Sequence, residues 1–194
     1  MEYIKEQLID DMLTILFGTE GISSYSMNHI IDMYCWLLTE RAYNLSKEKT
    51  KNAKYAGCNY WSETALKEYQ KNSSKNKYKG LKHEHVVPRC LFRKYLCDLI
   101  SKYSGKGIDE KKKTEIKKKI NKCFIGCVVT FEEAEKIDKL HKNSFPNSIE
   151  TLSDINEENI WNRYKVVGDI KIKEVEWEFT ANKWSILNET EINI

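Results

Sequence analysis

Two histidines and a glutamate stand next to one another in a short segment that ends at a proline. His83, Glu84 and His85 are followed by two β-branched valines at 86–87 and by Pro88. The valine pair is typical of a buried strand, and Pro88 suits the first turn of a following helix. Neighbouring side chains of a strand point to opposite faces. His83 and His85 should therefore share one face, and Glu84 should point away unless the strand bulges.

These residue types can carry acid–base and metal chemistry, so all three are candidate catalytic residues. Imidazole titrates near neutral pH and can take a proton from water. The Glu84 carboxylate is a typical ligand for a hard divalent cation. The competing interpretation is a surface strand end that carries histidine and glutamate by chance.

A second strand and a further helix are expected later in the chain. The apolar segment 123–129 predicts the strand. Thr130 and Glu133 follow with the spacing of a capping box, which predicts a helix from there towards Leu140. The pattern is therefore a polar strand, an apolar strand and a capped helix.

A basic helix is expected between the two strands, at 110–122. Outside Ile116 and Ile120 it is almost entirely polar, and seven of its residues are lysines. Such a helix presents either a solvated face or a surface that contacts phosphates. The lysines that we consider as nucleic-acid contacts are Lys112, Lys113 and Lys117.

The run from Glu84 to Pro88 resembles the first half of the HNH endonuclease motif, in which a base histidine follows an acidic residue or a histidine. Residues 128–136 are similar to the second strand and the helix of that family. The resemblance covers about 81–141 and implies a ββα-metal core that hydrolyses phosphodiester bonds with a divalent ion, Mg²⁺ or Mn²⁺. It implies DNA as the substrate, with RNA left open, and a role in restriction or anti-phage defence.

The resemblance also assigns roles to individual residues. His85 matches the general base, Glu84 matches the metal ligand before it, and the helix ligand falls on or near Glu133. Three other residues compete for the place of the helix ligand: Glu132, Asp138 and His141. His83 would support the base or contact a phosphate. The expected phosphate contacts are Lys82, Arg89, Arg93, Lys112, Lys113 and Lys117.

The chain departs from the family pattern in ways that leave the ligand set open. The central asparagine of the motif has no clear match, and two helices are expected between the strands. The CxxC pairs of zinc-stabilised HNH domains are missing. The second interpretation is therefore a non-catalytic nucleic-acid-binding or interaction protein on a degenerate ββα scaffold.

The six cysteines do not follow a zinc-knuckle spacing, so core positions are the favoured interpretation. The alternative is a four-thiol zinc site. It would use Cys90, Cys97, Cys123 and Cys127.

At 194 residues, the chain is expected to form one compact α+β domain that is mostly helical. Its regions would be an N-terminal helical part (1–80), the ββα core with its basic insertion (81–142), and a terminal helix and β-hairpin (143–194). A third helix is expected from Trp61. The sequence has neither an apolar run that could span a bilayer nor a signal peptide, which predicts a cytoplasmic protein. A homodimer is left open.

Overall fold

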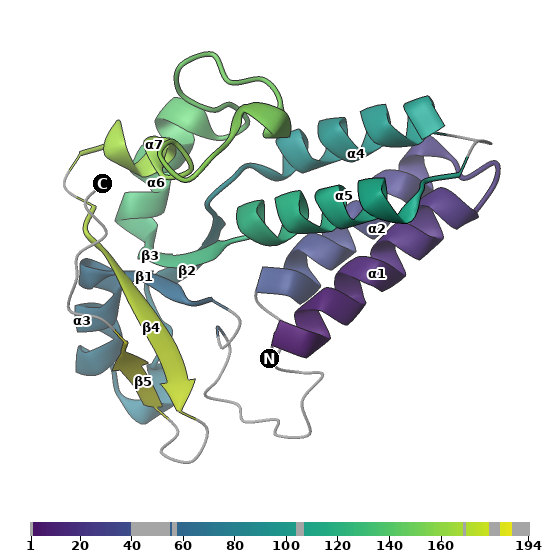
Figure 1. Cartoon of the computed structure of the whole chain (residues 1–194). Helices are drawn as coiled ribbons and strands as arrows, with labels where there is room; N and C mark the ends of the chain where they lie inside the picture. The colour runs from purple at the N-terminus through teal and green to yellow at the C-terminus, as the bar shows by residue number, and fades with distance from the viewer. Residues whose placement is uncertain are drawn as a thin grey trace.

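Helices and one mixed sheet make up the described part of the chain, and this confirms the α+β class. The computed structural model describes residues 2–39, 55, 58–103, 107–168, 170–178 and 183–187. Within them are seven α-helices and a five-stranded sheet (Figure 1). The α-helices are α1 (Glu2–Gly18), α2 (Ser24–Thr39), α3 (Glu63–Lys71), α4 (Arg89–Tyr103), α5 (Glu110–Cys123), α6 (Phe131–His141) and α7 (Asn162–Lys165). The strands are β1 (Tyr60–Ser62), β2 (Leu81–His85), β3 (Gly126–Thr130), β4 (Ile172–Glu178) and β5 (Lys183–Ile186).

The sheet has the strand order β2-β3-β1-β4-β5. β1 and β3 run parallel, and the other neighbouring strands are antiparallel. The expected C-terminal hairpin is present as β4 and β5. β2, which carries the two histidines, is an edge strand, so only one of its sides is covered by a neighbouring strand.

Strand β1 lies in the middle of the sheet, where the sequence pattern predicts the start of a helix. The helix starts later because the Ser62 side chain accepts a hydrogen bond from the Ala65 backbone nitrogen at 3.0 Å and caps α3. Trp61, just before this cap, is extended and fully buried. A short strand therefore replaces the first turn that was expected.

The two strands predicted around the basic helix pair with each other, and a helix follows the second. In the antiparallel register, His83 lies opposite Val128 and His85 opposite Gly126. α5 continues to Cys123, so β3 begins three residues later than predicted. The predicted capping box is confirmed, since Thr130 and Glu133 bond reciprocally at the start of α6. β2, β3 and α6 thus form a strand–strand–helix unit.

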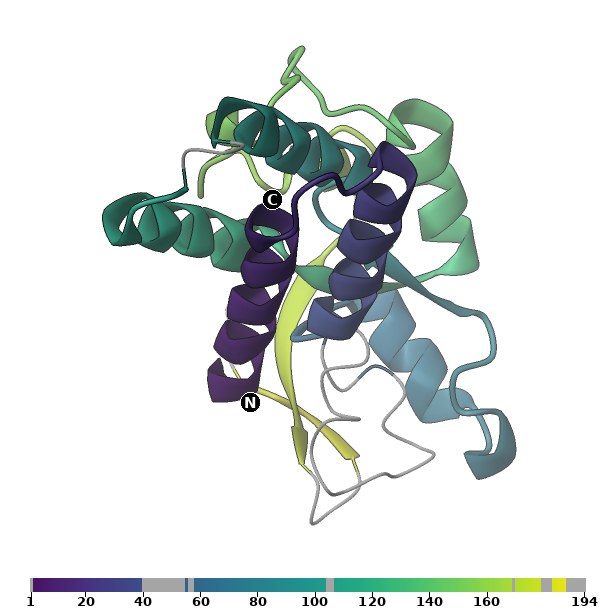
Figure 2. The ribbon, with the colours of Figure 1, turned by 90° about the vertical axis from the view of Figure 1, so that its right-hand side faces the viewer.

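The helices cover the sheet on both sides. Figures 1 and 2 show α1 and α2 side by side, with α4 and α5 packed across them. The larger core cluster includes Leu8, Phe92 and Tyr164, so the three regions expected from the sequence share one core. A smaller cluster under α3 contains Trp61 and Val128. None of the helices in the ranges given above is both long and apolar enough to cross a bilayer.

Gly126 allows three side chains to approach β3 closely. A Cβ atom built there would lie 2.8 Å from His83 Nε2, 2.9 Å from Cys58 Sγ and 3.0 Å from Thr39 Cβ. These atoms belong to three different segments that meet beside His85. Glycine is required at this position because the space of a methyl group is already filled.

We expect Gly126→Ala to destabilise the fold by about 1–3 kcal/mol, as overpacking of a well-packed interior does. Gly18 is the matched control, because a Cβ atom there meets nothing within 4 Å. Urea unfolding of both variants measures the difference. Equal stability of Gly126→Ala and Gly18→Ala would contradict the close packing around His83.

Candidate active site

A cleft of about 260 Å³ lies along the edge strand β2. Side chains from α2, β2, α4, α6 and α7 surround it, with two residues that follow α6. The lining residues are Trp36, Lys82, His83, Glu84, His85, Pro88, Arg89, Cys90, Arg93, Asp138, Lys142, Asn143 and Arg163. Five of these side chains are cationic and two are carboxylates. The cleft is therefore suited to an anion.

Helix α2 fixes the His85 ring and its proton. His85 Nε2 lies 3.5 Å from Thr39 Oγ1, and the Thr39 hydroxyl itself donates to the Cys35 carbonyl oxygen at 2.6 Å. Since that hydroxyl hydrogen is already used, Thr39 accepts from His85, and Nε2 carries the ring proton. Nδ1 keeps the lone pair and is the nitrogen that can accept a proton from water.

Burial and nearby positive charge keep His85 neutral. Burial is the main cause that lowers the pKa of His85 to about 3, and the guanidinium groups of Arg89 and Arg163 add to it. The imidazole is therefore unprotonated at neutral pH. A bound anion that neutralises Arg89 and Arg163 removes two of these causes and makes His85 a stronger base.

His83 packs against the His85 ring, on the face of β2 that strand alternation predicts. Its ring centroid lies 4.6 Å from that of His85 and 4.9 Å from that of Trp36. The His83 side chain is buried, with 7% of the residue exposed. Its position supports the orientation of His85.

Lys82 holds two carboxylates together at the cleft. Lys82 Nζ lies 2.8 Å from Glu84 Oε1 and 3.1 Å from Asp138 Oδ2, so it joins β2 to α6. Burial raises the pKa of Glu84, while Lys82 and Arg163 oppose this rise. The contacts with the two carboxylates outweigh desolvation and raise the pKa of Lys82. Lys82, expected to contact a phosphate, is instead paired with acids.

The structure does not bring Glu133 to the cleft. Glu133 Oε2 accepts hydrogen bonds from Ser62 Oγ at 2.6 Å and from the Thr130 backbone nitrogen at 2.8 Å. Its carboxylate is used in capping α6 and in joining that cap to α3. Of the competing residues, Glu132 is exposed and His141 contacts Ser144 in a neighbouring hollow. Asp138 is the one that lies beside Glu84.

Glu84 and Asp138 fit a divalent ion that also binds water and a phosphate. Mg²⁺ is commonly held by one or two carboxylates while it keeps waters or phosphate oxygens. The two carboxylates already share one cationic group, that of Lys82, which a metal ion would have to displace. Among the residues that the structure describes, no three His, Cys, Asp or Glu side chains form a group able to hold a metal ion. The other ligands would therefore come from water and substrate.

Arg163 places a buried positive charge at the cleft. Only 2% of the residue is exposed, and Nη1 donates to the His85 carbonyl oxygen at 2.8 Å. Among the residues that the structure describes, none forms a hydrogen bond with its Nε. A buried guanidinium without a full set of acceptors is costly, and an anion in the cleft would offset that cost.

Arg89 and Arg93 share a single carboxylate. Arg93 Nη2 lies 2.7 Å from Asp32 Oδ2, and Arg89 Nη1 lies 3.7 Å from Asp32 Oδ1. Arg89 also lies over the Trp36 ring, 5.8 Å from its centroid. Two cations with one shared acid leave positive charge available for a phosphate, in line with the predicted role of both arginines.

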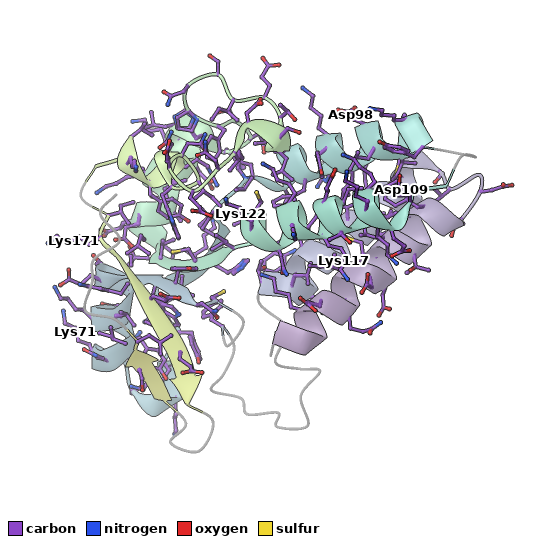
Figure 3. All side chains as sticks on the ribbon, in the orientation of Figure 1. Lys71, Asp98, Asp109, Lys117, Lys122 and Lys171 are labelled. Carbon is purple, nitrogen blue, oxygen red and sulfur yellow. The ribbon has the colours of Figure 1, made fainter. Side chains whose placement is uncertain are left out.

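The lysines of α5 lie apart from the cleft, and none of them lines it. Lys117 Nζ lies 2.7 Å from Asp10 Oδ2, and Lys113 Nζ lies 3.7 Å from Asp10 Oδ1. Lys112 pairs with Glu115 at 2.8 Å. Figure 3 shows Lys117 and Lys122 along α5, with Asp109 at its start. The three lysines stay predicted nucleic-acid contacts, although each already has an acidic partner.

The cysteines lie in or beside the core. Cys123 and Cys127, from the four-thiol alternative, are buried, whereas Cys90 and Cys97 are half-buried. Burial raises the pKa of Cys123 to about 11 and that of Cys127 well above its usual value. Zinc binds thiolates, so these environments oppose zinc ligation.

Comparison with protein-family models, with curated proteins and with solved structures finds no match for this chain.

Three residues of the site lie outside the predicted motif. Trp36 and Thr39 come from α2 and Arg163 from α7, all of them far from β2 in the sequence. The spacing of Trp36 and Thr39 places them on one side of a helix, but nothing in the sequence pairs that side with the histidine strand. Only the tertiary fold brings them together.

We expect the stability of the protein to fall as the pH drops from about 6.5 towards 3. The unfolded chain takes up a proton on His85 in this range and the folded chain does not. Protonation therefore stabilises the unfolded state and lowers the free energy of unfolding. This one group contributes at most about 1.4 kcal/mol per pH unit. Urea unfolding at several pH values gives the free energy of unfolding as a function of pH. This free energy should change less steeply with pH for His85→Gln than for the wild type. Identical slopes would contradict a buried, neutral His85.

Proposed function

We propose that this protein is a metal-dependent endonuclease of the HNH type that hydrolyses phosphodiester bonds in DNA. One arrangement carries the proposal: a cleft lined with positive charge contains both the neutral His85 imidazole and a carboxylate pair that holds a cation. The strand–strand–helix unit that carries these groups has the element order of the family that the sequence resembles.

The cationic side chains would hold a phosphodiester of the DNA backbone. Arg163 supplies a buried guanidinium, and Arg89 and Arg93 supply two more beside the single Asp32 carboxylate. Arginine suits phosphate because its planar fork matches two oxygens. Such contacts position a nucleic acid and do not read its sequence.

His85 would act as the general base. Thr39 fixes Nε2 as the protonated nitrogen, so Nδ1 takes the proton from the attacking water. The phosphate neutralises the guanidinium groups that lower the pKa of His85, so substrate binding itself would strengthen the base. A divalent ion held by Glu84 and Asp138 would supply stabilisation of the negative charge on the phosphate and on the leaving oxygen.

A second function has support from one observation. Lys82 already fills the space between Glu84 and Asp138, and a tethered ammonium can bind anions without catalysing their hydrolysis. A chain with this arrangement could bind nucleic acid on the same scaffold without cleaving it. The two functions differ in whether a divalent ion displaces Lys82.

The biological setting rests on the resemblance alone. We propose a role in restriction or anti-phage defence in the cytoplasm, with DNA as substrate and RNA as the alternative. In this proposal Lys112, Lys113 and Lys117 would contact phosphates at a distance from the cleft. These contacts would add affinity for any sequence and would not take part in the reaction.

Supercoiled plasmid incubated with Mg²⁺ or Mn²⁺, with an EDTA control, tests the endonuclease activity. We expect His85→Ala to lower the cleavage rate by about 10²–10⁴-fold, because the general base is lost. Asp138→Asn and Glu84→Gln should shift activity to higher metal concentrations. Glu132→Gln, an exposed change on the same helix as Asp138, is the control and should behave as wild type.

Near wild-type cleavage by a folded His85→Ala protein would contradict its role as the base. An unchanged metal titration for Asp138→Asn would remove it as a ligand. Wild-type protein that binds DNA and leaves it intact with either metal would favour the non-catalytic function.

A further inference from the structure

A second hollow, of about 590 Å³, adjoins the cleft. It lies between the start of α4 and the segment 141–150 that closes α6 and follows it. Cys90 and Asn143 line both the hollow and the cleft. A ligand bound by the cleft cations can therefore extend into this second space.

The chemistry of the hollow differs from that of the cleft. Its two formal charges, on Lys94 and Glu150, lie 3.8 Å apart and offset each other. The remaining lining is mostly amide, hydroxyl and apolar: it includes Asn143, Asn147, Ser148 and Phe145. Side chains of this kind match a neutral, planar ligand with hydrogen-bonding edges better than they match a phosphate.

The segment that forms the wall of the hollow is held in a defined shape. Cys90 Sγ donates to the Asn143 carbonyl oxygen at 3.2 Å, and Phe145 is 4% exposed, so the first part of the segment is anchored to α4 and to the core. Asn147 and Ser148 have φ values of +60° and +55°. Two consecutive non-glycine residues in the left-handed region are strained, and such strain concentrates where a chain holds a ligand.

We propose that this hollow binds the nucleobase and sugar of the nucleotide whose phosphate lies in the cleft. The inference rests on the proposed function, because it takes a nucleotide phosphate as the group bound by Arg89 and Arg163. The amides of Asn143 and Asn147 both donate and accept, so they can bond to the edge of a base. Ile149, which is partly exposed, offers apolar surface to its face. The hollow thus gives the enzyme a preference for the nucleotide beside the bond that it cleaves.

Binding in a metal-free buffer with EDTA tests the inference without relying on cleavage. The probes are inorganic phosphate and the four deoxynucleoside 5′-monophosphates, titrated by calorimetry. At least one nucleotide should bind about tenfold more tightly than phosphate, the equivalent of one or two net hydrogen bonds. The double variant Asn147→Gly/Ser148→Gly should remove most of this gain and leave the affinity for phosphate unchanged, because both residues line the hollow and neither lines the cleft.

The double variant should fold, because both replaced residues have positive φ values and glycine adopts that conformation freely. Asn76 is an exposed asparagine that lines neither the hollow nor the cleft, so Asn76→Ala is the matched control. This variant should keep the full difference in affinity between the nucleotide and phosphate. Equal affinity for phosphate and all four nucleotides would overturn the inference and leave the anion cleft standing. A gain that survives the double variant would also overturn it. Failure to bind phosphate or any nucleotide would overturn both the hollow and the cleft as binding sites.

Discussion

An ammonium group held between two carboxylates joins the edge strand to the helix beside it, and the cleft depends on this contact. Lys82 alternates with Glu84 along β2 and so points to the same side of the strand, where Asp138 of α6 meets them. Two carboxylates this close repel each other unless a cation lies between them. The identity of that cation decides what the cleft can do.

The cleft contains negatively charged and positively charged side chains, and each kind favours a ligand of the opposite charge. Glu84 and Asp138 favour a cation, whereas Arg163, whose Nε has no partner within the described part of the chain, favours an anion. A divalent ion bound to a phosphate would satisfy both together, and it would free Lys82 to bind a phosphate oxygen. The same arrangement explains the neutral His85, whose pKa is lowered by burial and by guanidinium groups that an anion would neutralise.

Local patterns were enough to predict the strand with the histidines, the second strand and the capping box at Thr130, because each depends on neighbours in the sequence. The same pattern could not separate the two possible uses of Glu133. Its capping role was visible in the spacing, but only the Ser62 hydrogen bond shows that the carboxylate also joins the cap to α3, away from the cleft. Thr39 and Arg163 were missed because long-range packing brings them to His85. Strand β1 was missed because three residues are too few to show a period.

Titration of Mn²⁺ into wild-type protein and into Lys82→Met tests most directly whether Glu84 and Asp138 form a metal site. Methionine removes the competing ammonium and keeps a chain of similar length. We predict that Lys82→Met binds Mn²⁺ at least about tenfold more tightly than wild type, a difference of about 1.4 kcal/mol. Adding Asp138→Asn to Lys82→Met should abolish the gain. Equally weak Mn²⁺ binding by wild type and a folded Lys82→Met protein would contradict a metal site at these carboxylates.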